Sequence, residues 1–281
     1  MPLPNFLIIG AQKAGTTWLL RQLRQHPEVF MPSEEIHFFD KEHHYTNGLS
    51  WYKQFFEGVT TESAIGEKTP DYCWTNQPGA EGHLPNVHRN IYETLPDAKL
   101  ILLVRNPVDR AVSAANHLIR TRRVPPQYSI DQLLVGDKRD LAQTHGVLDY
   151  GRYHKHIQAY LNYFDRDQLL VLVFEEAVVD NPQRALERVA SFLGVDPSFP
   201  FEKVQTRENP PGISKAGLYV RFYAPPLAPI VKALDKYLLG RNYKQFPSDD
   251  TRETLYDFYR NDNEQLYQFL GRRIPSWTRP S

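Results

Sequence analysis

Residues 10–18, GAQKAGTTW, have the types and spacing of a loop that binds an anion. Two glycines stand at the spacing of the phosphate-binding sequence G-x-x-x-x-G-K-[ST], and Thr17 takes the place of its last residue. Thr16 stands where that sequence has its lysine, and the lysine of this loop, Lys13, lies inside it instead. The displaced lysine raises the question of which anion the loop holds.

The apolar run NFLII precedes this loop, so a strand, a tight turn and the start of a helix are expected here. Such a turn directs several backbone N–H groups at one place, where the helix dipole adds positive potential. Thr16 and Thr17 can add hydroxyl donors, and Lys13 adds a full charge. We expect the loop to bind phosphate or a similar oxyanion; the alternative is a tight turn that binds nothing.

A second charged group, Arg105, directly follows the apolar run Leu100–Val104. The ends of parallel strands meet at one edge of a sheet, so we expect Arg105 beside the first loop. If Pro107 begins a helix, Ser113 lies about two turns along it and can bind the same anion. The alternatives are a surface salt bridge for Arg105 and a purely structural position for Ser113.

An arginine at this place distinguishes the chain from a nucleotide-hydrolysing protein, which holds Mg²⁺ with a Walker-B aspartate. The two loops together predict a nucleotide with two separate phosphate groups, bound without a metal.

Residues 32–40, PSEEIHFFD, bring carboxylates and an imidazole together. In an extended chain Glu35 and His37 share one face, within reach of one acceptor group. A carboxylate placed in this way can act as a general base. The alternative is a solvated acidic loop with a structural histidine, and the neighbouring Glu34 leaves an ambiguity of one residue.

The composition excludes several classes of protein. The 281 residues include 33 basic and 33 acidic side chains, which argues against binding nucleic acid or a membrane through net charge. Cys73 is the only cysteine, so no intramolecular disulfide and no cysteine-based metal site is possible. No apolar stretch approaches the roughly 18 residues of a membrane span, and the first residues lack the pattern of a signal peptide. We expect a cytoplasmic protein.

Three apolar runs, in which apolar and polar residues do not alternate, predict strands buried on both faces of a parallel sheet. They are Phe6–Ile9, Leu100–Val104 and Leu169–Phe174. Helical patterns lie between and after them, at Thr17–Gln25, Pro107–Thr121, Tyr150–Phe164, Pro182–Leu193 and Asp249–Leu270. This alternation predicts an α/β fold, with a P-loop-like central parallel sheet and helices on both faces, as a single domain over residues 1–281. Val204–Lys244 is predicted as a covering loop with a short helix around Ala228–Leu239.

The motifs resemble those of the sulfotransferases that use 3′-phosphoadenosine 5′-phosphosulfate (PAPS). FLIIGAQKAGTTWL is similar to their 5′-phosphosulfate loop, and LILLVRNPVDRAVSAANH to their 3′-phosphate segment. EEIHFFDKEHHYTNGLSWYKQFF, GEKTPDY and FYRNDNEQLYQFLGRRIPSW resemble the heparan sulfate 3-O- and N-sulfotransferase branch and its bacterial relatives. The match covers most of the chain in order, although the cysteine pair common in the animal 3-O-sulfotransferases is missing.

The resemblance implies a transfer of the sulfuryl group from PAPS to a hydroxyl or amine, with PAP as product and no metal required. Glu35 matches the family's base and His37 a histidine near the acceptor. Lys13 is expected to stabilise the leaving phosphate, and Lys68 matches a lysine at the transferring group. The expected donor-binding residues are Lys13, Ala14, Gly15, Thr16, Thr17, Trp18, Arg105 and Ser113, together with Lys215 on a loop that closes over the nucleotide.

The branch resembled suggests a carbohydrate acceptor, and the basic run Arg120–Arg123 is either a solvated helix end or a contact for an anionic acceptor. A lipid or natural-product hydroxyl is the alternative acceptor. Two other classes are a P-loop kinase and a non-catalytic nucleotide- or glycan-binding protein. The displaced lysine argues against the kinase, and the combination of Lys13, Glu35 and Lys68 argues against a protein that only binds. No nucleic-acid partner and no membrane span are expected, and the oligomeric state stays open.

Overall fold

The computed structural model describes residues 2–75, 82–205, 213–229 and 243–279. Five parallel strands form its sheet: β1 Phe6–Gly10, β2 Val29–Phe30, β3 Ala64–Lys68, β4 Lys99–Val104 and β5 Leu169–Val173. Their order is β2-β3-β1-β4-β5, so β1 lies in the middle. The chain builds one side of the sheet after β1 and the other side with β4 and β5. The connections therefore change direction beside β1, where ligands bind in open parallel sheets.

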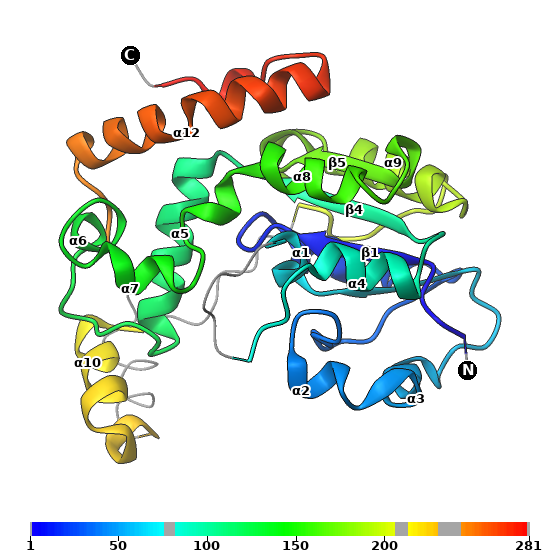
Figure 1. Ribbon diagram of the computed structural model, residues 1–281, viewed down its shortest axis with the longest axis horizontal. Coiled ribbons are helices and arrows are strands. Elements are labelled where there is room, and N and C mark those ends of the chain that lie inside the picture. The colour runs from blue at the N-terminus through cyan, green and yellow to red at the C-terminus, as the bar shows by residue number, and fades with distance from the viewer. Residues whose placement is uncertain (1, 76–81, 206–212, 230–242, 280–281) are drawn as a thin grey trace.

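The helices that surround the sheet are α1 Thr16–Leu23, α2 Glu42–Tyr45, α3 Gly48–Lys53, α4 Val87–Thr94, α5 Pro107–Arg120, α6 Ile130–Leu134, α7 Arg139–Gln143, α8 Tyr153–Leu161, α9 Pro182–Leu193, α10 Lys215–Tyr223 and α12 Asp249–Leu270. Short 3₁₀ turns occupy Gln54–Phe56, Pro70–Cys73, Asp149–Gly151, Arg166–Gln168, Pro225–Leu227 and Pro275–Trp277, and a π-helical turn occupies Glu175–Asp180. Figure 1 shows α12 along the side of α8, while α2 and α3 lie on the opposite side of the strands. The predicted α/β fold with flanking helices is confirmed.

Local signals explain where the main helices begin and end. Pro107 starts α5, and the side chain of Asn106 accepts hydrogen bonds from the Val108 and Asp109 amides. Gly194 ends α9 in the left-handed region, with a φ of 84°. Ser248 caps α12 through the Thr251 amide. The predicted bounds of α9 and α12 are confirmed.

The sheet residues are almost all buried, which accounts for the unbroken apolar character of β1, β4 and β5. β3 differs, because its sequence AIGEK contains a glycine and two charged residues yet is fully buried. Gly66 pairs with Phe6 across the sheet, and a Cβ at this glycine would lie 2.2 Å from the Phe6 ring. The aromatic ring thus fills the space that a side chain at position 66 would need.

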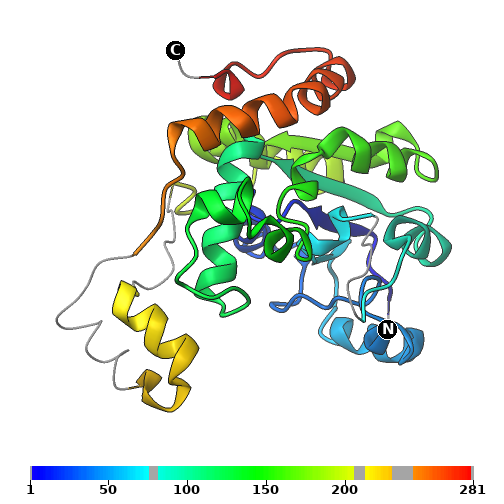
Figure 2. The same cartoon turned by 60° about the vertical axis from the view of Figure 1, so that its left-hand side comes forward.

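The predicted loop at Val204–Lys244 is wrong for its middle part, where α10 forms. The side chain of Ser214 accepts a hydrogen bond from the Gly217 amide and so caps this helix. Figure 2 shows α10 beyond the main body of the molecule, below α6 and α7. The predicted helix around Ala228–Leu239 falls mainly on residues 230–242, outside the described residues. In the described parts of the chain, no helix has the length and apolar composition that crossing a membrane requires.

Candidate active site

The loop after β1 has the geometry of an anion-binding turn. Gly15 precedes α1 with a φ of 96°, and a Cβ there would lie 2.8 Å from the Phe174 ring. Lys13 also has a positive φ, 69°. For a residue with a side chain this conformation costs about 1–2 kcal/mol, so the surrounding contacts must hold it. The Ala11 amide donates to the Leu103 carbonyl at 2.8 Å and ties the loop to β4.

Arg105, which follows β4, lies beside this loop as predicted. Its Nη1 donates to the Lys13 carbonyl at 3.2 Å, and its guanidinium lies over the Phe174 ring, 5.0 Å from the centroid. Tyr153 fixes the backbone at this point, because its hydroxyl donates to the Arg105 carbonyl at 2.7 Å and accepts from the Arg105 amide at 3.2 Å. Lys13 and Arg105, which are far apart in the sequence, therefore belong to one positively charged surface, here called the cationic wall.

One face of α5 completes the wall. Ser113, His117 and Arg120 are half-exposed, whereas the residues between them are buried. Their spacing of four and three residues places them on one side of the helix. Burial and, to a smaller extent, the charges of Lys13, Arg123 and Arg120 together lower the pKa of His117 to about 4. This face of α5 is thus directed towards Lys13.

Among the described residues, the cations of the wall are not ion-paired, although Glu35 acts on Lys13 through its charge. Burial lowers the pKa of Lys13, and the positive charges of Arg120 and Arg105 add to this effect. Within the described residues, Lys13, Arg105, Arg120 and Arg123 form no ion pair. Positive charges gathered in this way repel one another, and an anion bound among them would relieve the repulsion.

A second cluster, the Glu35 cluster, lies where β2 and β3 end. Lys68 is the last residue of β3 and is buried, and its Nζ donates a hydrogen bond to Oε1 of Glu35. The His37 Nε2 lies 3.6 Å from Oε2 of Glu35, and its Nδ1 lies 2.9 Å from Oδ2 of the buried Asp40. The acid and the imidazole that the sequence predicts on one face are therefore in contact.

The charges of this cluster are set by its contacts. Burial acts to raise the pKa of Glu35, but hydrogen bonds from His37 and the charge of Lys68 outweigh it and lower this pKa to about 2. Burial acts to lower the pKa of His37, but hydrogen bonds to Asp40 and Glu35 raise it to about 10. At neutral pH the cluster holds a carboxylate at Glu35 and an imidazolium at His37.

Asp71 lies near these residues, and His37, Asp40 and Asp71 each offer an atom within 4.8 Å of the others, as cation ligands do. These atoms already have partners, however. Nδ1 of His37 is bonded to Asp40, and Asp71 accepts from Gln12 at 3.4 Å and Tyr150 at 2.8 Å. A cation would have to displace the proton that His37 shares with Asp40, so a reaction without a metal stays our prediction.

The remaining residues predicted to bind the donor differ in their burial and in the contacts that they already make. Ala14 and Thr16 are buried in the loop and Thr17 is exposed. The indole of Trp18 donates to the Val204 carbonyl at 2.9 Å, so its N–H is already used. Lys215 is exposed at the start of α10, with its Nζ 5.9 Å from the centre of the Tyr243 ring.

Two further points concern these predicted residues. Lys215 makes no hydrogen bond or ion pair with a described residue, so its donor-binding role stays a prediction. Glu34 is bonded to Ser33 at 2.6 Å, whereas Glu35 contacts Lys68 and His37, which makes Glu35 the glutamate of the cluster.

Sequence reasoning missed the roles of Asp40 and His117. Asp40 stood inside the quoted acidic segment, and its spacing of three residues from His37 was the available signal. Ser113, His117 and Arg120 share a helix face, which the helical period within α5 could have shown.

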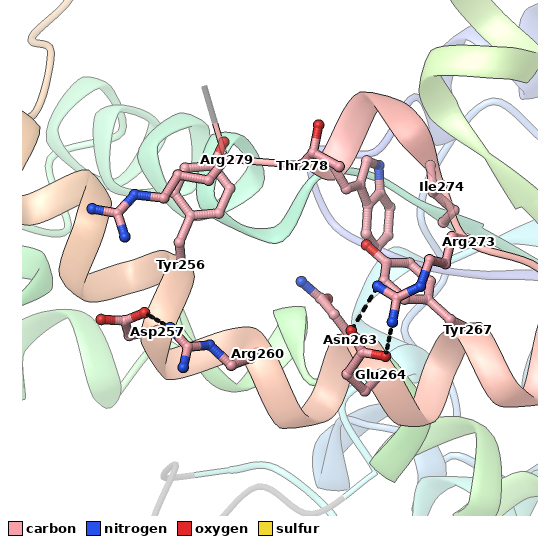
Figure 3. A pocket seen from close by; sticks show the side chains of 11 residues that line it. Tyr256, Asp257, Arg260, Asn263, Glu264, Tyr267, Arg273, Ile274, Thr278 and Arg279 are labelled. Carbon is pink, nitrogen blue, oxygen red and sulfur yellow. Dashed lines mark hydrogen bonds and ion pairs between the residues drawn. The ribbon is translucent and has the colours of Figure 1, made fainter. Parts of the chain in front are cut away.

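A hollow of about 180 Å³ on another part of the surface contrasts with this site. It lies between α12 and the C-terminal segment, and Figure 3 shows Arg260 and Arg273 each paired with an acid. Arg273 binds Glu264 at 2.8 Å, and Arg260 binds Asp257. None of the predicted site residues lines this hollow. Its cations are neutralised, unlike those beside the loop after β1.

Comparison with known proteins agrees with this geometry. A family model described as "Sulfotransferase domain" matches residues 3–209. The human heparan sulfate glucosamine 3-O-sulfotransferase 6 is 32% identical over 95% of this chain and 72% of its own length. The human bifunctional heparan sulfate N-deacetylase/N-sulfotransferase 3 is 30% identical over 99% of this chain and 31% of its own length.

The chain spans 64% of the mouse heparan sulfate glucosamine 3-O-sulfotransferase 3B1, to which it is 30% identical over 96% of its residues. Among solved structures, a sulfotransferase from Alicyclobacillus acidocaldarius is 27% identical with a TM-score of 0.71, covering 99% of this chain and 100% of that one. The resemblance noted in the motifs is confirmed, and the chain belongs to the sulfotransferase domain family.

Proposed function

We propose that the protein transfers the sulfuryl group of PAPS to a hydroxyl or amine of an acceptor. The observation that carries this proposal is the cationic wall beside the loop after β1, which forms no ion pair among the described residues and lies next to the Glu35 cluster. The wall suits a nucleotide with two anionic groups: Lys13 and the loop amides for the 5′-phosphosulfate, and Arg105 with Ser113 for the 3′-phosphate. The Glu35 cluster then supplies the base.

In this proposal the acceptor oxygen or nitrogen attacks sulfur in line with the bond to the leaving phosphate. The new bond to sulfur forms, the bond from sulfur to the phosphate oxygen breaks, and the phosphate of PAP keeps the electron pair. Glu35 takes the acceptor proton, and Lys13 stabilises the charge that grows on the leaving oxygen. His37, held protonated by Asp40, fixes the orientation of the Glu35 carboxylate.

The pKa of Glu35, lowered to about 2, makes it a weak base while Lys68 and His37 both neutralise it. A base works best when its pKa lies near the working pH. If Lys68 turns towards the transferring group, Glu35 loses one positive partner and its pKa rises. Lys68 would then link binding of the donor to activation of the base.

A carbohydrate acceptor fits the three curated relatives reported above, all of which are named for heparan sulfate. Arg120, whose charge acts on Lys13, and the exposed Arg123 form no ion pair with a described residue, which favours an acceptor with acidic groups. A lipid or natural-product hydroxyl is the competing acceptor. A cytoplasmic location stays a prediction.

A screen with PAPS tests the proposal. The panel holds unsulfated and N-sulfated glycosaminoglycan oligosaccharides, neutral oligosaccharides, and hydroxylated lipids and polyketides. Formation of PAP and of a product heavier by one sulfuryl group is expected with an acidic oligosaccharide, and not with the Glu35→Gln variant. Turnover of ATP with Mg²⁺ and none of PAPS would contradict it and favour a kinase.

A further inference from the structure

Glu67 is a buried carboxylate that the proposed transfer does not use. It lies between Gly66 and Lys68 on β3 and is 0% exposed. Because neighbouring strand residues face opposite sides of a sheet, Lys68 is directed to the site and Glu67 away from it. Burial raises the pKa of Glu67 to about 7, although three hydroxyl groups donate to it. A buried carboxylate is costly, so packing alone does not account for this residue.

The three hydroxyls belong to Tyr52, Thr69 and Tyr72. The Tyr52 hydroxyl lies 2.5 Å and the Tyr72 hydroxyl 3.1 Å from Oε1 of Glu67. The Thr69 Oγ1 lies 3.1 Å from Oε2. Since each hydroxyl gives its single proton to Glu67, its lone pairs are left to accept from elsewhere.

Two of these hydroxyls accept from the backbone of the segment that carries the Glu35 cluster. The Tyr72 hydroxyl accepts from the Phe38 amide at 3.0 Å and, more weakly, from the Phe39 amide at 3.4 Å. The Thr69 Oγ1 accepts from the His37 amide at 3.3 Å. Three consecutive amides are thus held by groups that Glu67 orients.

These hydrogen bonds hold the backbone at a residue with an unfavourable conformation. His37 has a φ of 54°, which for a residue with a side chain is an unfavourable left-handed conformation. Without fixed acceptors for its amides, the segment would relax and carry the His37 imidazole and the Glu35 carboxylate away from each other. A displacement of about 1 Å can cost a reaction about a hundredfold.

We propose that Glu67 is a positioning residue, which acts through Tyr72 and Thr69 to hold the backbone of residues 37–39 and so to aim the Glu35 cluster at the acceptor. Glu67 touches no reacting atom in this role. The kinetic part of the inference rests on the proposed function, whereas the backbone contacts do not.

Tyr52 and Tyr72 offer a matched pair of variants. Both hydroxyls donate to the same oxygen of Glu67 and both side chains are 0% exposed. Only the Tyr72 hydroxyl accepts from the segment, because Tyr52 meets it through ring contacts, stacking on Phe38 with centroids 4.5 Å apart. Removing either hydroxyl therefore weakens the core similarly, but only one removal frees the backbone.

The experiment measures backbone amide exchange by NMR and transfer kinetics for the wild type, Tyr72→Phe and Tyr52→Phe. In Tyr72→Phe we expect the Phe38 amide to exchange about tenfold faster and kcat to fall about tenfold or more, with KM for PAPS within about twofold. In Tyr52→Phe we expect both quantities to stay within about threefold of the wild type. Equal effects in the two variants, or wild-type exchange and kcat in Tyr72→Phe, would overturn the inference.

Thr69 gives a second, independent pair if Tyr72→Phe does not fold. Thr69→Val removes the hydroxyl that accepts from the His37 amide, and Thr69→Ser keeps it. We expect faster exchange of the His37 amide and a lower kcat in Thr69→Val, with recovery in Thr69→Ser; equal losses in both would overturn the inference. If the wild type transfers nothing, the proposed function fails, and the exchange measurements still decide whether the hydroxyls that donate to Glu67 hold the segment.

Discussion

Lys68 donates a hydrogen bond to Glu35 across 33 residues of sequence and so joins the end of β3 to the segment that follows β2. The lysine is buried, whereas the glutamate side chain is 41% exposed. The pair places the Glu35 carboxylate at the surface of the site, where the positive charge of the buried Lys68 balances its negative charge. In the proposed reaction this carboxylate is the base, and the lysine lies where the sulfuryl group would pass.

The first prediction concerns Glu35→Gln. The amide keeps an oxygen for the hydrogen bond from Lys68 but cannot take a proton, so we expect kcat to fall by about 10²- to 10⁴-fold. The donor loop has no hydrogen bond to Glu35, so the affinity for PAP should stay within about threefold. Steady-state kinetics and calorimetric titration with PAP measure the two quantities. Turnover that survives together with lost PAP binding would mean that Glu35 is not the base.

A second prediction follows from the charge of His37. Its pKa is raised from the usual 6.5 to about 10 in the folded state, so protonated His37 stabilises the fold fully below pH 6.5. That stabilisation is lost as the pH rises through 10. We expect the difference in unfolding free energy between wild type and His37→Gln to be largest near pH 6 and to vanish above about pH 10.

Urea unfolding at several pH values, followed by circular dichroism, measures this difference. Asp40→Asn serves as a check, because it removes the hydrogen bond that most raises the pKa of His37 and should shift the loss of stability to lower pH. A difference between wild type and His37→Gln that stays constant over this pH range would show that His37 is not held as an imidazolium.

Arg105 carries a third prediction, about recognition of the 3′-phosphate. PAP and AMP differ in that group alone, so the ratio of their affinities isolates it. In Arg105→Ala we expect the preference for PAP over AMP to fall about 10- to 100-fold, as for a lost charge-assisted hydrogen bond. Lys13→Ala is the matched control, since it should weaken both ligands alike. An Arg105→Ala variant that weakens PAP and AMP equally would place the 3′-phosphate elsewhere.

The sequence predicts those strands and site residues that a continuous stretch of residues indicates by itself. β1, β4 and β5 are buried on both faces and therefore read as unbroken apolar runs. The loop after β1 and Arg105 follow such strands directly, so their meeting at one edge of the sheet followed from the fold class. β2 has two residues, too few for any pattern.

The other half of the site depended on contacts that no local pattern records. β3 lies inside the sheet although it contains Gly66 and Glu67. The strand can be buried because the Phe6 ring covers Gly66 and three hydroxyls donate hydrogen bonds to Glu67. Asp40 looks like any acidic loop residue until the fold buries it against His37. α10 has the sequence KAGLYVRFY, whose apolar residues are spread round the helix and do not mark a single buried face, and a loop is predicted in its place.

The central claim is that the loop after β1 and the arginine after β4 hold a nucleotide with two anionic groups, without a metal. Calorimetric titration with PAP in the presence of a chelator, on wild type and on Lys13→Ala, tests it most directly. The account predicts metal-independent binding that weakens about tenfold or more in the variant. No binding of PAP, or binding of ATP only when Mg²⁺ is added, would contradict it.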